Sequence, residues 1–263
     1  MEYPLVSVLY PVFNDSPEHI QESMYSIINQ DYPNLEIIIV DDSNDASSIE
    51  TLNLFRSDER VKILRIKHQG GLPQALNNGL SIARGKYIAR ADADDIQFPN
   101  RIKSQVDFLE KNHSIGILGC NINYIDERGN HIKVRQYPET DDSIRKYLHL
   151  RNPLCHSVVM IRRKILDEIG QYNPEFKRAE DYELWLRASA NNVKLHNLQQ
   201  VLMDYRMATG EKRDQLNWKM NLKLKKKYFS SRYLFESAIG ILSIYLYVLT
   251  PISLQNYIYK KLA

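Results

Sequence analysis

Three carboxylates stand within four positions in the first half of the chain, in the tetrad Asp92, Ala93, Asp94 and Asp95. The segment 86–91 precedes them and is expected to be a strand, so the tetrad lies at a strand end. Side chains that alternate along an extended segment point to opposite sides, so one carboxylate can bind a hard divalent cation while another binds a hydroxyl group. The alternative is a solvated acidic turn that caps the following helix.

A second acidic pair, Glu180 and Asp181, opens a segment with the apolar spacing of a helix through Leu184, Trp185 and Ala188. One interpretation is structural, because the helix dipole favours acidic residues in a first turn. The other is chemical, because a carboxylate within hydrogen-bond reach of a hydroxyl group can remove its proton and activate the oxygen as a nucleophile. The pair is therefore a candidate general base.

The elements around these groups alternate between strands and helices. Short apolar segments predict buried strands at 5–10, 36–40, 61–66 and 86–91. Amphipathic stretches between them are typical of helices, one of which begins at Ser16 and Pro17. This alternation predicts right-handed crossovers and a mostly parallel sheet covered on both faces. Ligands bind beyond the carboxyl ends of such strands, where the tetrad lies.

We therefore predict an α/β fold with a Rossmann-like central sheet in one domain, plus a C-terminal helical tail. The remaining elements expected are a helix at 99–110, strands at 115–119 and 157–161, and a helix at 180–190. The expected boundaries are a domain at 1–210, with halves 1–119 and 120–210, and a tail at 211–263.

Composition narrows the class of protein. The chain has 263 residues, of which 43% are hydrophobic and 25% charged, as in an ordinary globular protein. A net charge of +3 is too small to favour nucleic-acid binding over the whole surface. Cys120 and Cys155 lack the paired spacing of a zinc site, which favours a reducing compartment. Since the first twelve residues do not read as a signal peptide, we expect a cytoplasmic protein.

The last fifty residues differ from the rest. A basic stretch contains Lys219, Lys223, Lys225, Lys226, Lys227 and Arg232. The segment 237–259 has no formal charge, but its dense apolar part is only about 238–249, which is short for a spanning helix. We expect this tail, with Lys260 and Lys261, to dock on anionic lipid at the inner face of the cytoplasmic membrane. The alternative is a hydrophobic cover over the domain or a dimer contact.

Several motifs follow one another in an order typical of one family. They are the segments 6–14, 40–43, 75–79, 87–95 and 179–182. In these segments the chain resembles the inverting family-2 glycosyltransferases with the A-type fold, and in particular bacterial enzymes that extend lipopolysaccharide, lipooligosaccharide or capsule chains. The resemblance covers roughly residues 4–206.

The resemblance implies a reaction. A hexose or N-acetylhexosamine would pass from a UDP-sugar to an oligosaccharide or lipid-linked saccharide acceptor, with inversion and with Mn²⁺ or Mg²⁺ as cofactor. The sequence lacks the Gln-x-x-Arg-Trp motif of processive members, so transfer of a single sugar is expected.

The resemblance also implies roles for residues of the donor half. Pro11 and Asn14 would lie beside the nucleotide base, and Asp42 would accept a hydrogen bond from uracil. Asn77 and Gly79 match a segment that helps to form the donor pocket.

Other roles concern the acidic groups and the acceptor. Asp92 would contact the ribose, the donor sugar or the metal, and Asp94 is the expected metal ligand. Asp181 is the expected catalytic base, while Glu180 binds acceptor or orients its neighbour. His156 matches a segment beneath the acceptor site and would bind a phosphate or a hydroxyl group; the alternative is a hydrogen-bonded partner inside the sheet.

Two other functions compete with transfer. A sugar nucleotidyltransferase uses a related sheet, but it usually has a glycine-rich loop where this chain has residues 11–14. A catalytically inactive carbohydrate-binding module would have no reason to retain both acidic groups.

Overall fold

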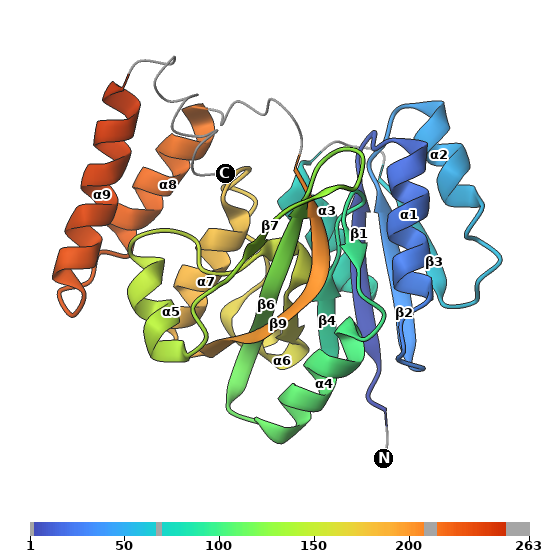
Figure 1. Cartoon of the computed structure of the whole chain (residues 1–263), viewed down its shortest axis with the longest axis horizontal. Coiled ribbons are helices and arrows are strands. Elements are labelled where there is room, and N and C mark those ends of the chain that lie inside the picture. The colour runs from blue at the N-terminus through green and yellow to red at the C-terminus, as the bar shows by residue number, and fades with distance from the viewer. Residues whose placement is uncertain (1–2, 67–69, 208–214, 251–263) are drawn as a thin grey trace.

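The computed structural model describes residues 3–66, 70–207 and 215–250. Within them one sheet runs through the middle of the molecule with helices on either side (Figure 1). Its strands are β1 (Val6–Val12), β2 (Leu35–Asp41), β3 (Val61–Arg65), β4 (Tyr87–Arg90), β5 (Ile96–Gln97), β6 (Ile115–Ile125), β7 (His131–Arg135), β8 (Met160–Arg162) and β9 (Lys194–Arg206). Their order is β3-β2-β1-β4-β8-β6-β9-β5, with β7 paired to β6.

The expected parallel arrangement holds for the first half of the sheet, where β3, β2, β1 and β4 are parallel neighbours. Beyond β4 the directions mix. The strand β8 is antiparallel to both β4 and β6, while β9 is parallel to β6 and antiparallel to β5. The carboxyl ends of β1, β2 and β4 therefore share one edge.

Helices cover both faces of the sheet, as predicted. They are α1 (Pro17–Ile28), α2 (Ala46–Asn53), α3 (Leu72–Ile82), α4 (Arg101–Lys111), α5 (Asp141–Leu148), α6 (Arg163–Ile169), α7 (Glu180–Ala190), α8 (Gln215–Lys227) and α9 (Leu234–Leu249). Side chains of α1, α2 and α4 form one apolar cluster with alternate residues of β1 such as Val8 and Tyr10. Leu9 points to the other face, into a cluster built from α3, α5, α6 and α7.

Local chemistry explains where the first helix begins. The Ser16 hydroxyl accepts a hydrogen bond from the His19 backbone N–H at 3.2 Å, and Pro17 occupies the first turn. The predicted cap is confirmed.

Two expected elements differ from the structure. The strand expected at 157–161 is a 3₁₀ turn, His156–Val158, followed by the short strand β8. The strand expected at 115–119 continues to Ile125 because its second half pairs with β7 and β9. Those partners lie far along the chain, so local periodicity carries no sign of them.

The tail lies beside α5 and α7, with α8 and α9 next to each other (Figure 1). Leu224 of α8 is fully buried in the cluster that contains α7, and Met220 packs against it. Lys225, expected among the lipid-facing lysines, is buried at 7% exposure. None of the described helices is long and apolar enough to cross a bilayer. Lys260 and Lys261 lie outside the described residues.

Candidate active site

The two acidic groups lie around one buried guanidinium. Arg90, the last residue of β4, is 2% exposed, and its Nη2 forms an ion pair with Asp92 Oδ1. Its positive charge also lowers the pKa of both Glu180 and Asp181, although burial raises these values more strongly. Arg90 was not among the residues predicted for the site; a basic residue inside an otherwise buried strand is the sequence signal that marks it. The tetrad and the pair therefore converge on Arg90.

Negative charge is concentrated at the tetrad. Burial, followed by the charges of Asp92 and Asp15, raises the pKa of Asp94 to about 7. Burial, followed by the charges of Asp94 and Asp92, raises the pKa of Asp95 well above its ordinary value. Repulsion of this kind is relieved by a bound cation.

The carboxylates fit a divalent cation that also binds substrate. Among the described residues, no three histidine, cysteine or acidic side chains are grouped closely enough to hold a metal by themselves. Two carboxylates are nevertheless a sufficient protein contribution for Mg²⁺, because substrate phosphates and water supply the remaining oxygens. Asp92 and Asp94 are the side chains that would hold it.

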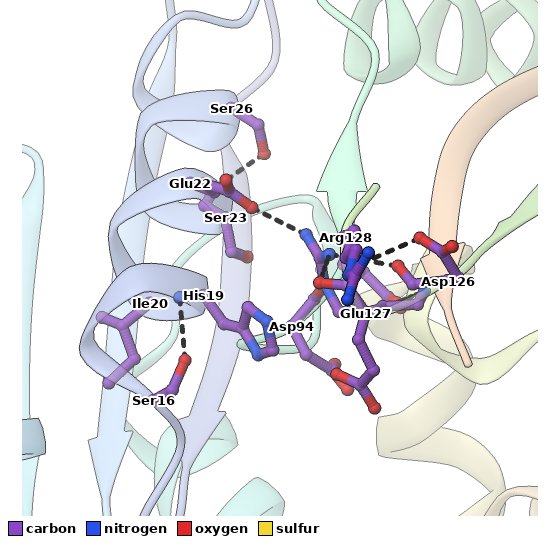
Figure 2. A network of polar contacts seen from close by, with 12 residues as sticks. Ser16, His19, Ile20, Glu22, Ser23, Ser26, Asp94, Asp126, Glu127 and Arg128 are labelled. Carbon is purple, nitrogen blue, oxygen red and sulfur yellow. Dashed lines mark hydrogen bonds and ion pairs between the residues drawn. The ribbon is translucent and has the colours of Figure 1, made fainter. Parts of the chain in front are cut away.

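A buried arginine at the end of β9 fixes the turn that carries Asp94. The Nε of Arg206 donates to the Asp94 carbonyl oxygen at 3.1 Å, and its Nη2 pairs with Glu22 of α1 at 2.7 Å. Its Nη1 donates to the carbonyl oxygens of Asp126 and Glu127. Figure 2 shows Glu22, Asp94 and the 126–128 turn gathered in this network. Three segments that are distant in sequence are thus held at one point.

Another residue beside the tetrad comes from α1. Figure 2 shows the His19 ring turned toward Asp94 from the first turn of that helix. Burial raises the pKa of Asp15, and the nearby His19 acts in the opposite direction. His19 was not predicted, because a single histidine on a helix carries no spacing signal.

The acidic pair opens α7 in the predicted position. Ala179 precedes it with φ of 60°, in the left-handed region that non-glycine residues rarely adopt. Burial and the neighbouring Asp181 raise the pKa of Glu180 to about 8. Asn152 donates from Nδ2 to Asp181 Oδ2 at 2.6 Å, which fixes the orientation of this carboxylate.

His156 lies next to this pair. Its Nε2 is 2.9 Å from the Tyr172 hydroxyl, and its Nδ1 is 3.8 Å from Glu180 Oε1. Burial and the charge of Arg90 hold the pKa of His156 well below its ordinary value, so the ring is neutral. Tyr172, which the sequence analysis missed, connects this histidine to helix α3 through its backbone.

Two residues expected in the donor pocket make contacts within the domain. Asn77 donates to the Tyr172 carbonyl oxygen at 2.8 Å and accepts from the Tyr172 N–H at 3.0 Å. Gly79 lets α3 lie close to the sheet, because a Cβ there would stand 2.9 Å from Val40 Cγ2 and 3.1 Å from Leu9 Cδ2. These contacts fix α3 against the sheet and against the loop that contains Tyr172.

The expected nucleotide-base loop lies at the carboxyl ends of β1 and β2. Pro11 is half-buried within β1, and Asn14 follows with φ of 56°. The Asn14 Oδ1 accepts hydrogen bonds from the N–H groups of Asn44 and Asp45, which ties the two strand ends together. Asp42 is 8% exposed, and its Oδ1 is buried without a hydrogen-bond partner. An unpartnered buried carboxylate oxygen needs a donor, which a nucleotide base can supply.

Comparison with known proteins decides the family. Residues 7–170, more than half of the chain, match the family described as glycosyl transferase family 2. The chain belongs to this family. It is also 30% identical, over 98% of its own length and 96% of the relative's, to an Escherichia coli protein named UDP-Gal:alpha-D-GlcNAc-diphosphoundecaprenol beta-1,3-galactosyltransferase. The family-2 match spans β1 to α6 and includes the tetrad but ends before α7.

Solved glycosyltransferase structures share the fold. Residues 1–349 of Staphylococcus aureus TarS, in complex with UDP-GlcNAc, superpose with a TM-score of 0.71 at 19% identity, covering 95% of this chain and 77% of that 1–349 chain. The mannosyltransferase PcManGT from Pyrobaculum calidifontis, in complex with GDP-Man and Mn²⁺, gives a TM-score of 0.67 at 17% identity, covering 94% and 71%. The A-type glycosyltransferase fold expected from the sequence is confirmed.

Proposed function

We propose that this glycosyltransferase moves a hexose or N-acetylhexosamine from a UDP-sugar to a saccharide acceptor, one sugar at a time and with inversion. The acceptor is an oligosaccharide or a lipid-linked saccharide in the synthesis of bacterial lipopolysaccharide, lipooligosaccharide or capsule. The name of the E. coli relative, which includes UDP-Gal and a diphosphoundecaprenol acceptor, supports this class of substrates. The UDP-GlcNAc complex of TarS supports the donor.

The convergence of both acidic groups on Arg90 carries this proposal. In the proposed mechanism, Asp181 accepts the proton of the acceptor hydroxyl as its oxygen attacks the anomeric carbon opposite the departing UDP. Asn152 holds one oxygen of that carboxylate, burial raises the pKa of Asp181, and Glu180 would bind the acceptor or orient its neighbour. Residues 1–119 would bind the nucleotide-sugar and residues 120–210 the acceptor.

The donor half binds and orients UDP in this proposal. The unpartnered Oδ1 of Asp42 would accept from the uracil N–H, beside Pro11 and Asn14. Asp92 would contact the ribose or the donor sugar, and with Asp94 it would hold Mn²⁺ or Mg²⁺. When bound, the cation neutralises the diphosphate and stabilises the charge on the leaving UDP. The complex of PcManGT with Mn²⁺ supports this cofactor.

Hydrolysis of nucleotide-sugars by the purified protein tests the proposal. We expect slow release of UDP that requires Mn²⁺ or Mg²⁺, and loss of this release in Asp94→Asn. Asp181→Asn should keep the release but lose transfer to an added acceptor. Pyrophosphate as the product would instead indicate a nucleotidyltransferase, and an inert protein would indicate a binding module.

We further propose that the tail, residues 211–263, seats the enzyme on an anionic lipid surface at the cytoplasmic face of the membrane. The buried side of α9 consists of Ser237, Gly240 and Ile244, while Phe235 and Leu249 are each 79% exposed. Other large apolar side chains of α9 are also exposed, namely Leu234, Ile239, Leu242, Leu246 and Val248. Apolar side chains in this number beside cationic ones suit the interface of a bilayer.

Lysines of α8 supply the cationic part of this surface. Lys223, Lys226 and Lys227 are exposed on α8, and the Lys226 ammonium lies 5.6 Å from the ring centroid of Tyr245 on α9. Each lysine close to an anionic membrane contributes roughly 1 kcal/mol to binding. We assign this surface to phospholipid and not to a second copy of the chain, because cationic lysines accompany its apolar side chains.

Sedimentation with vesicles tests this surface in the full chain. Phosphatidylglycerol vesicles should bind the protein and phosphatidylcholine vesicles should bind it less. Ile239→Glu combined with Leu246→Glu should remove binding, whereas Glu substitutions at the exposed Ile132 and Val134 of β7 should not. A protein that stays in the supernatant but elutes as a dimer would assign the apolar face to self-association.

A further inference from the structure

The turn that follows α5 connects the tail to the acidic pair. Its residues, 148–152, end with Asn152, whose amide holds Asp181. Before that, the Leu148 carbonyl oxygen accepts a hydrogen bond from the Tyr182 hydroxyl. The carbonyl oxygens of His149 and Leu150 accept hydrogen bonds from helix α8. The last carbonyl groups of a helix lack partners within it and carry its negative dipole end, so they need donors or cations.

Lys225 of α8 supplies that cation. Its Nζ donates to the carbonyl oxygens of His149 at 2.8 Å and Leu150 at 2.9 Å, and to the Tyr182 hydroxyl at 3.2 Å. Three acceptors match the three hydrogens of an ammonium group, which offsets the cost of burying it. Tyr182 is the residue after Asp181, so Lys225 contacts both segments that define the position of this carboxylate.

Helix α9 reaches the same turn. The Ser237 hydroxyl is 3.1 Å from His149 Nδ1, and the Tyr233 ring stacks on His149 with centroids 5.1 Å apart. At Gly240 an added Cβ would lie 1.9 Å from the His149 carbonyl oxygen and 2.9 Å from Lys225 Nζ. Only glycine fits there, because the obstructing atom belongs to the backbone. Both tail helices are therefore docked on the turn that leads to Asn152.

We propose that Lys225 is a positioning residue for transfer, which fixes the 148–152 turn and through it the Asn152 amide on Asp181. The tail would then help to position the catalytic base, in addition to its proposed contact with the membrane. This inference rests on the proposed role of Asp181 as the base. Lys225 acts only through the turn and touches no reacting atom.

A double-mutant cycle in the full chain tests the proposal. Lys225→Met and Asn152→Ala should each lower kcat for transfer about tenfold, since small displacements of a base have such effects. The double variant should lose little more than either single one, because both changes act through one contact. Lys219→Met, an exposed lysine on the same helix, is the matched control.

Readouts besides kcat separate positioning from loss of stability. The Kd for UDP and the rate of donor hydrolysis without acceptor should stay within twofold of wild type in Lys225→Met. Gly240→Ala, which keeps the lysine but pushes on the His149 carbonyl, should reproduce the selective loss of transfer. It serves as the second variant where Lys225→Met fails to fold.

The outcomes distinguish this inference from the proposed function. Full transfer by Asp181→Asn would overturn the role of the base and with it the positioning role. Loss of transfer in Asp181→Asn, together with additive effects of Lys225→Met and Asn152→Ala, would overturn the positioning role alone. An equal loss of UDP binding and transfer in Lys225→Met would assign Lys225 to general stability.

Discussion

The backbone N–H of Arg206 donates to Oδ1 of Asp95 at 3.0 Å, across 111 positions of the chain. Asp95 is fully buried, so its carboxyl group serves the fold and leaves Asp92 and Asp94 as the proposed cation ligands. Together with the bond from the Arg206 side chain to the Asp94 carbonyl oxygen, this contact fixes the tetrad to the end of β9. The position of the proposed cation ligands therefore depends on a residue in the second half of the chain.

Removing the Arg206 side chain should weaken metal dependence. In Arg206→Met we expect the apparent affinity for Mn²⁺ in donor hydrolysis to fall about tenfold, as for other residues that orient metal ligands. Glu22→Gln is the matched control, because Glu22 pairs with the same guanidinium but is 55% exposed. Equal Mn²⁺ titrations for Arg206→Met and wild type would contradict the role of Arg206.

The base and the cation ligand should separate kinetically. Asp181→Asn should lower kcat for transfer about a thousandfold, as is typical for loss of a general base, with the Kd for UDP unchanged. Asp94→Asn should instead abolish the response to Mn²⁺. Steady-state kinetics and calorimetric measurement of UDP binding check both predictions. A changed Kd for UDP in Asp181→Asn, without a change in kcat, would contradict the assignment of Asp181 as the base.

The rate of transfer should rise with pH as the acidic pair loses its shared proton. Burial raises the pKa of both carboxyls, and that of Glu180 lies at about 8, so the acidic limb should fall near neutral pH. Glu180→Gln removes the neighbouring charge, so the remaining limb should move to lower pH. Glu168→Gln, at an exposed position, is the control. An acidic limb of the pH–rate profile that stays in place in both variants would show that another group titrates.

Stability should depend on pH through the same residue. The pKa of Glu180 is raised from 4.5 to about 8 in the folded chain, so the folded state holds the proton more tightly. Its contribution to the free energy of unfolding is fully present below 4.5 and is lost as the pH rises through about 8. Glu180→Gln cannot ionise. In alkaline buffer we therefore expect its free energy of unfolding to exceed that of wild type by on the order of 2 kcal/mol, and its Tm to be higher by several degrees. Thermal unfolding in acidic and alkaline buffer checks this, and equal Tm differences in both would contradict it.

Nucleotide affinity should depend on Asp42. Asp42→Ala removes the acceptor proposed for uracil, and a hydrogen bond to a charged group contributes about 1.5–3 kcal/mol, so the Kd for UDP should rise about tenfold or more. Asp45→Asn is the matched control, since it lies in the same loop and asparagine keeps its capping role on α2. An equal affinity in Asp42→Ala would place the base elsewhere.

Features encoded by local sequence were predictable. The helix at Glu180–Ala190 and the Ser16 cap depend on residues within one or two turns, and both match the structure. The four parallel strands follow from short apolar segments between helices. The residues of the candidate site were predictable from the resemblance to family 2 and not from local pattern.

Features encoded by distant contacts were not predictable. Lys225 belongs to a run of lysines that reads as a solvated face, and its burial depends on carbonyl groups some seventy-five positions earlier. Arg206 is a single basic residue whose partner Glu22 lies in α1, and the charge of Arg90 acts on Glu180 and Asp181 of α7. A single basic residue forms no repeating sequence pattern, so its partners become known only from the folded structure.

The strand β9 sets the distance between the two acidic groups, the tetrad and the pair at the start of α7. It starts directly after the segment that closes α7 and runs without a break to the residue that holds the tetrad. Because one strand connects the end of α7 to the tetrad, the two acidic groups are held at one separation in this structure. In the proposed function, that separation sets the room available between donor and acceptor.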